Sequence, residues 1–198
     1  CCGDPARLLG QEHLFQEVAK TQIEELKKRK FKVLLVSCPH CYNVLKNEYA
    51  QLGGVFNVVH HSEFLHEMLW AGTLNPVKGE KSKIVYHDPC YLGRYQKIYD
   101  SPREVIRAIP GAEVAELKNS RDRSLCCGGG GGHFWMDIKK GERVNNIRVD
   151  QAKDQNADTI ITSCAYCMQM LDDSVKLMNL DDKIKVKDIA TLVLESLD

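Results

Sequence analysis

The nine cysteines of this chain are spaced in a pattern that occurs twice. In each half an adjacent Cys-Cys-Gly is followed, after 35 or 36 residues, by a Cys-x-x-Cys motif. The first set comprises Cys1, Cys2, Cys38 and Cys41, and the second comprises Cys126, Cys127, Cys164 and Cys167. Cys90, 36 positions before Cys126, adds a fifth thiol to the second set. The repeated spacing predicts two halves of similar structure that bring thiols from distant segments together.

The balance of charge and the hydropathy exclude several classes of protein. The 198 residues carry 27 basic and 27 acidic side chains, so the chain lacks the positive field that nucleic acids and anionic membranes require. The longest purely apolar runs, such as 33–36, have four residues, so this segment is not expected to span a membrane. We therefore expect neither a nucleic-acid partner nor a membrane-spanning segment.

The number of cysteines argues against a disulfide-stapled secreted protein. Nine is odd, and a chain in which 43% of residues are hydrophobic can build a core without such staples. We expect a cytoplasmic protein with metal or redox chemistry. Because the chain begins at Cys1, inside a motif and without Met, we also expect a longer parent protein, attached to a membrane, if at all, through its other segments.

Hydrophobic periodicity predicts strands that alternate with helices in both halves. We expect helices at 11–30, 42–52, 62–69, 142–154, 168–177 and 188–197, and strands at 33–37, 55–59, 83–87, 159–162 and 184–186. A polar linker at 72–81 separates the halves. The predicted fold class is α/β, with two pseudo-repeated lobes at 1–76 and 77–198, each a mainly parallel sheet flanked by helices.

The predicted strands place cysteines where parallel sheets collect ligands. Cys38, Cys90 and Cys164 each follow a strand, and the carboxyl ends of parallel strands lie at one edge of a sheet. The pair Cys126-Cys127 precedes a glycine-rich turn. We therefore expect the five thiols of the second set to meet at one point.

The number of thiols favours iron over zinc. Thiolates are soft ligands for zinc, copper(I) and iron–sulfur clusters. A tetrahedral zinc site gains nothing from a fifth thiol, whereas a four-iron cluster of unusual geometry could use all five. Zinc on a four-thiol subset remains the alternative, and it would make the chain a zinc-stabilised, non-enzymatic interaction module.

The run 128–132 consists of five glycines and follows the Cys126-Cys127 pair directly. Glycine lets the backbone approach a cluster closely and turn amide N–H groups toward inorganic sulfide, so Gly128, Gly129 and Gly130 are candidate cofactor-binding residues. A phosphate-binding loop is disfavoured because no Gly-Lys-Ser/Thr sequence follows. Residues 133–136 (His-Phe-Trp-Met) either line a pocket or anchor the loop to the core.

Other polar side chains are weaker candidates. His87 lies near Cys90 and could donate a proton or a hydrogen bond to a cluster, although a structural histidine is an equal alternative. Three further histidines on a helix-like segment are expected at the surface: His60, His61 and His66. Three arginines contact either an anionic substrate or only solvent: Arg94, Arg121 and Arg123.

The motif Cys38-Pro-His-Cys41 raises a rival hypothesis, a dithiol oxidoreductase of the thioredoxin type. A histidine between the thiols and a helix N-terminus beneath them would stabilise a thiolate. However, Ser37 stands where such enzymes have tryptophan, and a thioredoxin site accounts for two of the nine cysteines.

Two stretches, His87-Asp-Pro-Cys-Tyr-Leu-Gly-Arg94 and Cys126-Cys-Gly-Gly-Gly-Gly-Gly-His-Phe-Trp135, resemble the CCG-domain family. This is the cysteine-rich domain of the B-type and D-type catalytic components of heterodisulfide reductases and of related iron–sulfur oxidoreductases, and the resemblance is greatest to the D-type and flavoprotein-linked branch. It implies noncubane 4Fe–4S clusters, one or two in number. The second would use Cys90, Cys126, Cys127, Cys164 and Cys167, and the first would use Cys1, Cys2, Cys38, Cys41 and an upstream cysteine.

The resemblance also implies a function. We expect an oxidoreductase module in which Cys126, Cys127 and His87 are catalytic. Electrons would arrive from a partner subunit or domain with cubane iron–sulfur clusters or flavin, and would pass to a disulfide or to a quinone-linked acceptor. The alternative within this class is an electron relay to quinone from electron-transfer flavoprotein or a 2-hydroxy acid dehydrogenase.

Overall fold

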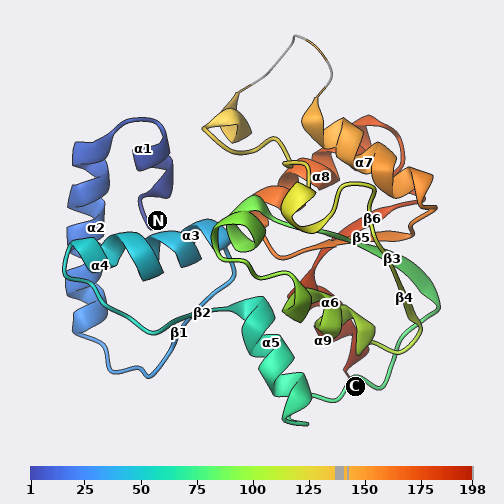
Figure 1. Cartoon of the computed structure of the whole chain (residues 1–198), viewed down its shortest axis with the longest axis horizontal. Coiled ribbons are helices and arrows are strands. Elements are labelled where there is room, and N and C mark those ends of the chain that lie inside the picture. The colour runs from blue at the N-terminus through green and yellow to red at the C-terminus, as the bar shows by residue number, and fades with distance from the viewer. Residues whose placement is uncertain (137–140, 142, 198) are drawn as a thin grey trace.

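Two parallel sheets form the framework of the computed structural model, which describes residues 1–136, 141 and 143–197 (Figure 1). The smaller sheet pairs β1 (Leu34–Val36) with β2 (Val58–His60). The larger has the order β4-β3-β5-β6, with bounds Ser82–His87 for β3, Ala112–Ala115 for β4, Thr159–Thr162 for β5 and Lys185–Asp188 for β6. Every strand pair is parallel, which confirms the predicted α/β class with two helix-flanked parallel sheets.

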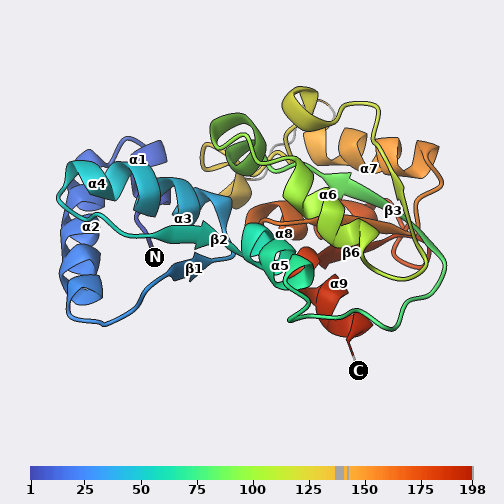
Figure 2. The ribbon, with the colours of Figure 1, turned by 60° about the horizontal axis from the view of Figure 1, so that its bottom comes forward.

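Helices surround both sheets (Figures 1 and 2). Around the smaller sheet they are α1 (Asp4–Leu8), α2 (Glu12–Lys27), α3 (Pro39–Asn43), α4 (Tyr49–Gln51) and α5 (His61–Trp70), with a π-helical turn at Val44–Glu48. Around the larger sheet they are α6 (Asp100–Arg107), α7 (Val144–Asp154), α8 (Ala165–Leu177) and α9 (Ile189–Ser196), with a π-helical turn at Tyr91–Tyr95 and 3₁₀ turns at Arg121–Arg123 and His133–Trp135. None of the helices described is both long and apolar enough to cross a bilayer.

The larger sheet is buried on both faces because its central strands carry apolar side chains at successive positions. In β3, Ile84 and Tyr86 pack toward α6 and α9, whereas Val85 packs with α7 and α8 on the opposite face. In β5, Ile161 packs toward α6 and α9, and Ile160 packs with α7 and α8. Successive side chains of a strand point to opposite faces, so uninterrupted apolar runs specify a sheet covered by helices on both sides.

The smaller sheet has its own core. Phe15, Ala19 and Ile23 recur at a spacing of four along α2 and are buried against Tyr42 and Tyr49. This stripe is the amphipathic pattern that the sequence shows at 11–30. The boundary between lobes at residues 76 and 77 stays a prediction, since α5 packs on α6 and its Leu65 and Leu69 join the core of the larger sheet.

Several element boundaries differ from those predicted. The helix expected at 42–52 begins at Pro39, because proline fits the first turn of a helix and Cys38 adopts extended backbone before it. The helix expected at 168–177 begins at Ala165, with Cys164 likewise extended before it. Residue 142, the first of another expected helix, lies outside the described residues, and α7 begins at Val144. The sequence reasoning missed α1, α6 and β4 altogether.

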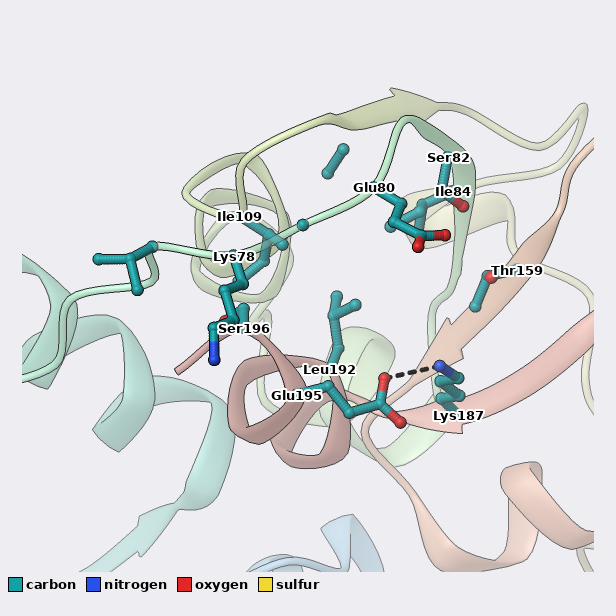
Figure 3. Close-up of a pocket in the computed structure, with 13 residues that line it drawn as sticks. Lys78, Glu80, Ser82, Ile84, Ile109, Thr159, Lys187, Leu192, Glu195 and Ser196 are labelled. Atoms are coloured by element: carbon teal, nitrogen blue, oxygen red, sulfur yellow. Dashed lines mark hydrogen bonds and ion pairs between the residues drawn. The ribbon is translucent and has the colours of Figure 1, made fainter. Parts of the chain in front are cut away.

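A cavity of about 710 Å³ lies at the amino-terminal ends of three strands of the larger sheet (Figure 3). Ser82, Ala112 and Thr159, the first residues of β3, β4 and β5, line it together with α9. An ion pair of 2.6 Å between Lys187 and Glu195 lies along its wall. The cysteines lie at the opposite, carboxyl ends of these strands, so this cavity is remote from the thiol chemistry.

Candidate functional site

The two Cys-x-x-Cys motifs adopt the same local structure. Cys38 follows β1 and Cys164 follows β5, each in extended backbone directly before a helix. The carbonyl oxygen of each first cysteine accepts a hydrogen bond of 2.9 Å from the backbone N–H four residues later. This geometry places the second cysteine of each motif in the first helical turn, so both thiols of a motif face the same side of the strand–helix junction.

The five thiols of the second set form a series in which each lies beside the next. Cys90 interacts with Cys126, Cys126 with its neighbour Cys127, Cys127 with Cys167, and Cys167 with Cys164. These residues come from three separate segments, and three of them are almost fully buried: Cys127, Cys164 and Cys167. The structure therefore brings these cysteines into one region, and their role as ligands of a single cluster stays a prediction.

Most of the first set continues the same series of contacts. The thiols of Cys2 and Cys41 lie 3.2 Å apart, and Cys41 also interacts with Cys38. Cys38 in turn interacts with Cys164 of the second set. Cys1 is exposed at the start of the chain. The Cys38 contact also bears on the thioredoxin hypothesis, because this motif is one part of a larger thiol group and not an isolated dithiol.

Interactions among the thiols lower the pKa of some of these cysteines and raise the pKa of others. The interaction with Cys164, followed by that with Cys41, lowers the pKa of Cys38 to about 2. The interaction with Cys126 raises the pKa of Cys127 to about 12, and the same interaction lowers the pKa of Cys126. Thiols this close cannot all ionise without a compensating positive charge, and a bound metal supplies such a charge.

The glycine run lies against the thiols through its first two residues. The backbone N–H of Gly128, at φ 86°, donates a 3.3 Å hydrogen bond to the sulfur of Cys126. A Cβ on Gly129 would stand 3.7 Å from the Cys127 sulfur and 3.1 Å from Met170. No heavy atom among the described residues lies within 4 Å of a Cβ placed on Gly130. The positive φ favours glycine at Gly128, and Met170 would crowd a side chain at Gly129. The role of Gly128, Gly129 and Gly130 in binding a cofactor stays a prediction.

Aromatic rings cover the buried cysteines. Tyr166, between Cys164 and Cys167, meets the rings of Phe134 at 5.0 Å and His40 at 5.1 Å. Phe134 packs on the cysteine cluster, so it anchors the loop, whereas Trp135 is 58% exposed. The cavity that these rings leave beside the glycine run measures about 10 Å³, room for about one water molecule.

The loop that carries Cys90 is held by a buried ion pair that sequence reasoning missed. Both carboxylate oxygens of Asp88 accept hydrogen bonds from Arg103, at 2.7 and 2.9 Å, and both residues are buried. Arg103 also donates to Glu116, and the backbone N–H of Arg121 donates to Asp88 at 2.8 Å. The acidic residue two positions before Cys90 could have indicated that Asp88 anchors this loop. Its partner Arg103, however, lies on α6, a helix that the sequence pattern did not reveal.

A second buried arginine lies behind His87. Arg148 of α7 donates from Nε to His87 Nδ1 at 2.9 Å, and both side chains have an exposed fraction of zero. Burial, followed by the charge of Arg148, lowers the pKa of His87 well below its ordinary value. A ring nitrogen of His87 lies within 4.8 Å of the sulfurs of Cys127 and Cys167.

The expectation that three histidines lie at the surface is wrong for His60 and His61. His60, the last residue of β2, and His61, the first residue of α5, are buried, with exposed fractions of 0% and 6%, whereas His66 is half-buried. His61 Nε2 lies 3.4 Å from Asp188, and His66 pairs with Glu104 of α6 at 2.5 Å. The sequence pattern did not reveal that His60 ends a buried strand, and it does not distinguish the inner face of a packed helix such as α5 from its outer face.

The three candidate arginines lie outside the cysteine cluster. Arg94 donates to the backbone carbonyl oxygens of Asp122 and Ser124. Arg121 pairs with Asp100 at 2.8 Å. Arg123 is exposed. The first two therefore brace the segment before Cys126.

Comparison with known proteins gives consistent results. The family model for the CCG cysteine-rich domain matches residues 1–46 and 84–172. The chain is 42% identical over 194 residues (98% of its length) to "Probable iron-sulfur-binding oxidoreductase FadF" of Bacillus subtilis, of which it covers 28%. It is 38% identical over its whole length to "EtfAB:quinone oxidoreductase" of Syntrophomonas wolfei, covering 29% of that protein. It is 33% identical over its whole length to the D-type component of a heterodisulfide reductase of Methanosarcina barkeri, covering 49%.

The chain thus spans between about a quarter and a half of these relatives. The matched residues contain all nine cysteines, and the structure gathers most of these at the carboxyl ends of the strands. The chain therefore belongs to the CCG cysteine-rich domain family.

Proposed function

We propose that this chain is the cluster-binding module of an iron–sulfur oxidoreductase. The observation that carries the proposal is the continuous series of thiol contacts from Cys90 through the second set to Cys38, Cys41 and Cys2. The relatives named as iron–sulfur proteins and quinone or heterodisulfide oxidoreductases agree with it. The chain supplies soft ligands in numbers that one zinc ion cannot use.

The proposed ligand sets are those that the family resemblance implies, and the thiol contacts support every member except Cys1. One cluster, proposed to be a noncubane 4Fe–4S cluster, is held by Cys90, Cys126, Cys127, Cys164 and Cys167. A second is held by Cys1, Cys2, Cys38, Cys41 and one ligand from outside this chain. Adjacent cysteines such as Cys126 and Cys127 suit two neighbouring irons of an extended cluster better than one small ion. When bound, the clusters supply one-electron redox chemistry.

The protein residues would position and shield these clusters. The N–H of Gly128 donates to a ligand sulfur, which stabilises negative charge there. Phe134 and Tyr166 exclude water from the buried thiols, and a dry surrounding controls the potential of a cluster. The ion pair between Asp88 and Arg103 holds the Cys90 loop in place.

Within this class we favour an electron relay over reduction of a disulfide at this site. A disulfide substrate needs an open site above the thiols, and the cavity between His40, the glycine run and Tyr166, which no cysteine lines, measures about 10 Å³. The relative whose name specifies quinone is 38% identical to the chain, against 33% for the heterodisulfide reductase component. Electrons would come from a partner's cubane clusters or flavin and pass to a quinone-linked acceptor.

Other parts of the parent protein would determine its location. A relative from Chromohalobacter salexigens, 38% identical over 201 residues, is named "Probable membrane-anchored ferredoxin". We propose that the module lies on the cytoplasmic side and that any membrane attachment resides outside this chain.

Metal analysis of the parent protein, purified without oxygen, tests the proposal. We expect iron and acid-labile sulfide in excess of what its other cysteine motifs hold, and a loss of iron when Cys126 is changed to Ser. A colourless protein that contains zinc at these thiols and no iron would establish the zinc-stabilised interaction module instead.

A further inference from the structure

The buried side of the second cysteine set contains a histidine whose two ring nitrogens have different surroundings. His87 lies at the carboxyl end of β3 and its side chain is inaccessible to solvent. Its Nδ1 lies 2.9 Å from Nε of Arg148. Its Nε2 is buried and has no hydrogen-bond partner among the residues that the structure describes. A buried polar atom without a partner is costly unless a ligand satisfies it.

Arg148 determines which nitrogen of His87 carries the proton. A guanidinium group has five donor N–H groups and cannot accept, so Nδ1 of His87 must be the acceptor in this pair. The neutral imidazole ring then carries its single proton on Nε2. Arg148 cannot turn away, since its other nitrogens donate to the carbonyl oxygen of Asn119, to Gln151 at 2.7 Å and to Ser124 at 3.1 Å.

The imidazole ring of His87 lies beside the thiols. The ligand atoms of His87, Cys127 and Cys167 all lie within 4.8 Å of one another, and the three residues are buried. By distance alone this trio could bind a metal through nitrogen and two sulfurs. A metal-bound imidazole nitrogen must however present its lone pair, and here Arg148 occupies the lone pair of Nδ1 while Nε2 carries the proton.

We infer that His87 is not a metal ligand but a fixed hydrogen-bond donor to the sulfur atoms of the second cluster, and that Arg148 is the positioning residue that holds it in this state. The inference rests on the proposed function and deepens it. A donor N–H stabilises the extra negative charge of a reduced cluster, so His87 raises the reduction potential of the site. A glutamine can present an N–H at a similar position, whereas leucine cannot.

The test uses the parent protein with its clusters and begins by identifying the signal of the second cluster. This is the electron paramagnetic resonance signal that is lost in Cys126→Ser. Pulsed measurements in H₂O and D₂O then report an exchangeable proton near that cluster. We expect this proton in the wild type and in His87→Gln, and its loss in His87→Leu. His66→Leu, the same change on a helix remote from the thiols, serves as the matched control and keeps the proton.

A redox titration of the same signal gives a second readout. At the midpoint potential of the wild type, we expect the ratio of reduced to oxidised cluster to be at least about fivefold lower in His87→Leu, a shift of about 40 mV at about 59 mV per tenfold. His87→Gln should recover most of this change. Arg148→Lys, which still donates to Nδ1, should keep the exchangeable proton, whereas Arg148→Gln, whose amide can also accept, should weaken its signal.

Three outcomes overturn the inference. A strong nitrogen coupling of a directly bound imidazole, lost in both His87 variants together with the iron of the second cluster, would make His87 a ligand. An unchanged proton signal and potential in His87→Leu would give it a purely structural role. If the wild type has no iron signal that depends on Cys126, the proposed function fails and the inference fails with it.

Discussion

The thiol of Cys38 lies beside the thiol of Cys164 and interacts with it, although the two residues are 126 positions apart in the chain. Both occupy the same place in the repeated strand–Cys–helix unit, so the contact joins the equivalent corners of two pseudo-repeats. Two clusters bound to the two sets would therefore be near neighbours. Such proximity suits the passage of single electrons from one set to the other.

Replacement of Cys127 by Ser tests the ligand assignment. Serine is close in size but is a hard ligand, so we expect loss of the iron and visible absorbance of the second cluster. The apo protein should lose only about 1 kcal/mol of free energy of unfolding, because the volume of the buried side chain changes little. Iron analysis and denaturant unfolding of the apo protein measure the two effects. Retention of full iron content would contradict the assignment. Cys1→Ser should leave the signal of the second cluster unchanged.

Replacement of Asp88 by Ala tests the role of the buried ion pair. The change leaves the charge of Arg103 buried with only Glu116 as a carboxylate partner, so we expect a loss of about 3–5 kcal/mol in the free energy of unfolding. The matched control is Asp100→Ala, which removes an exposed partner of Arg121 and should cost less than about 1 kcal/mol. Denaturant titration of both variants gives the comparison, and equal losses would show that burial of the Asp88 pair is irrelevant.

We expect the free energy of unfolding to respond differently to alanine at different positions of the glycine run. Gly132 has φ 80°, and a Cβ there would stand 2.6 Å from Leu9. Gly132→Ala should therefore cost about 1–2 kcal/mol from the backbone conformation alone, with the contact adding to it. At Gly130 an added Cβ has open space and no positive φ, so Gly130→Ala should be nearly neutral in stability. A loss of iron in Gly130→Ala despite unchanged stability would support the predicted role of Gly130 at the cofactor.

The stability should fall in acid partly through Glu116. Hydrogen bonds from Arg103 lower the pKa of Glu116 in the folded state. A carboxyl group with a lowered folded pKa stabilises the protein above its unfolded pKa, here 4.5, and this contribution is lost as the pH falls through the folded value. Unfolding of the wild type and Glu116→Gln near pH 7 and about pH 3 should show a difference that shrinks in acid. A difference independent of pH would refute this.

Much of the fold could be predicted from local patterns of apolar side chains in the sequence. The apolar pair at the centre of β5 and the stripe of α2 both predict their elements, because burial imposes characteristic patterns on the apolar side chains of strands and helices. By contrast α6 carries the buried Arg103, whose burial depends on Asp88 and Glu116 from other elements. No local pattern predicts a charge that is buried because distant residues neutralise it.

The sequence by itself determined the family, the α/β class and the set of cysteines, since spacing and residue type are local properties of the chain. Only the tertiary structure decided that Cys38 meets Cys164, that His60 and His61 are buried, and that Arg148 lies behind His87. These relationships join segments that lie far apart in the chain, and their geometry depends on how the two sheets and their helices pack. Packing through space leaves no fixed spacing in a sequence, and for that reason the protonated nitrogen of His87 could be assigned only from the folded protein.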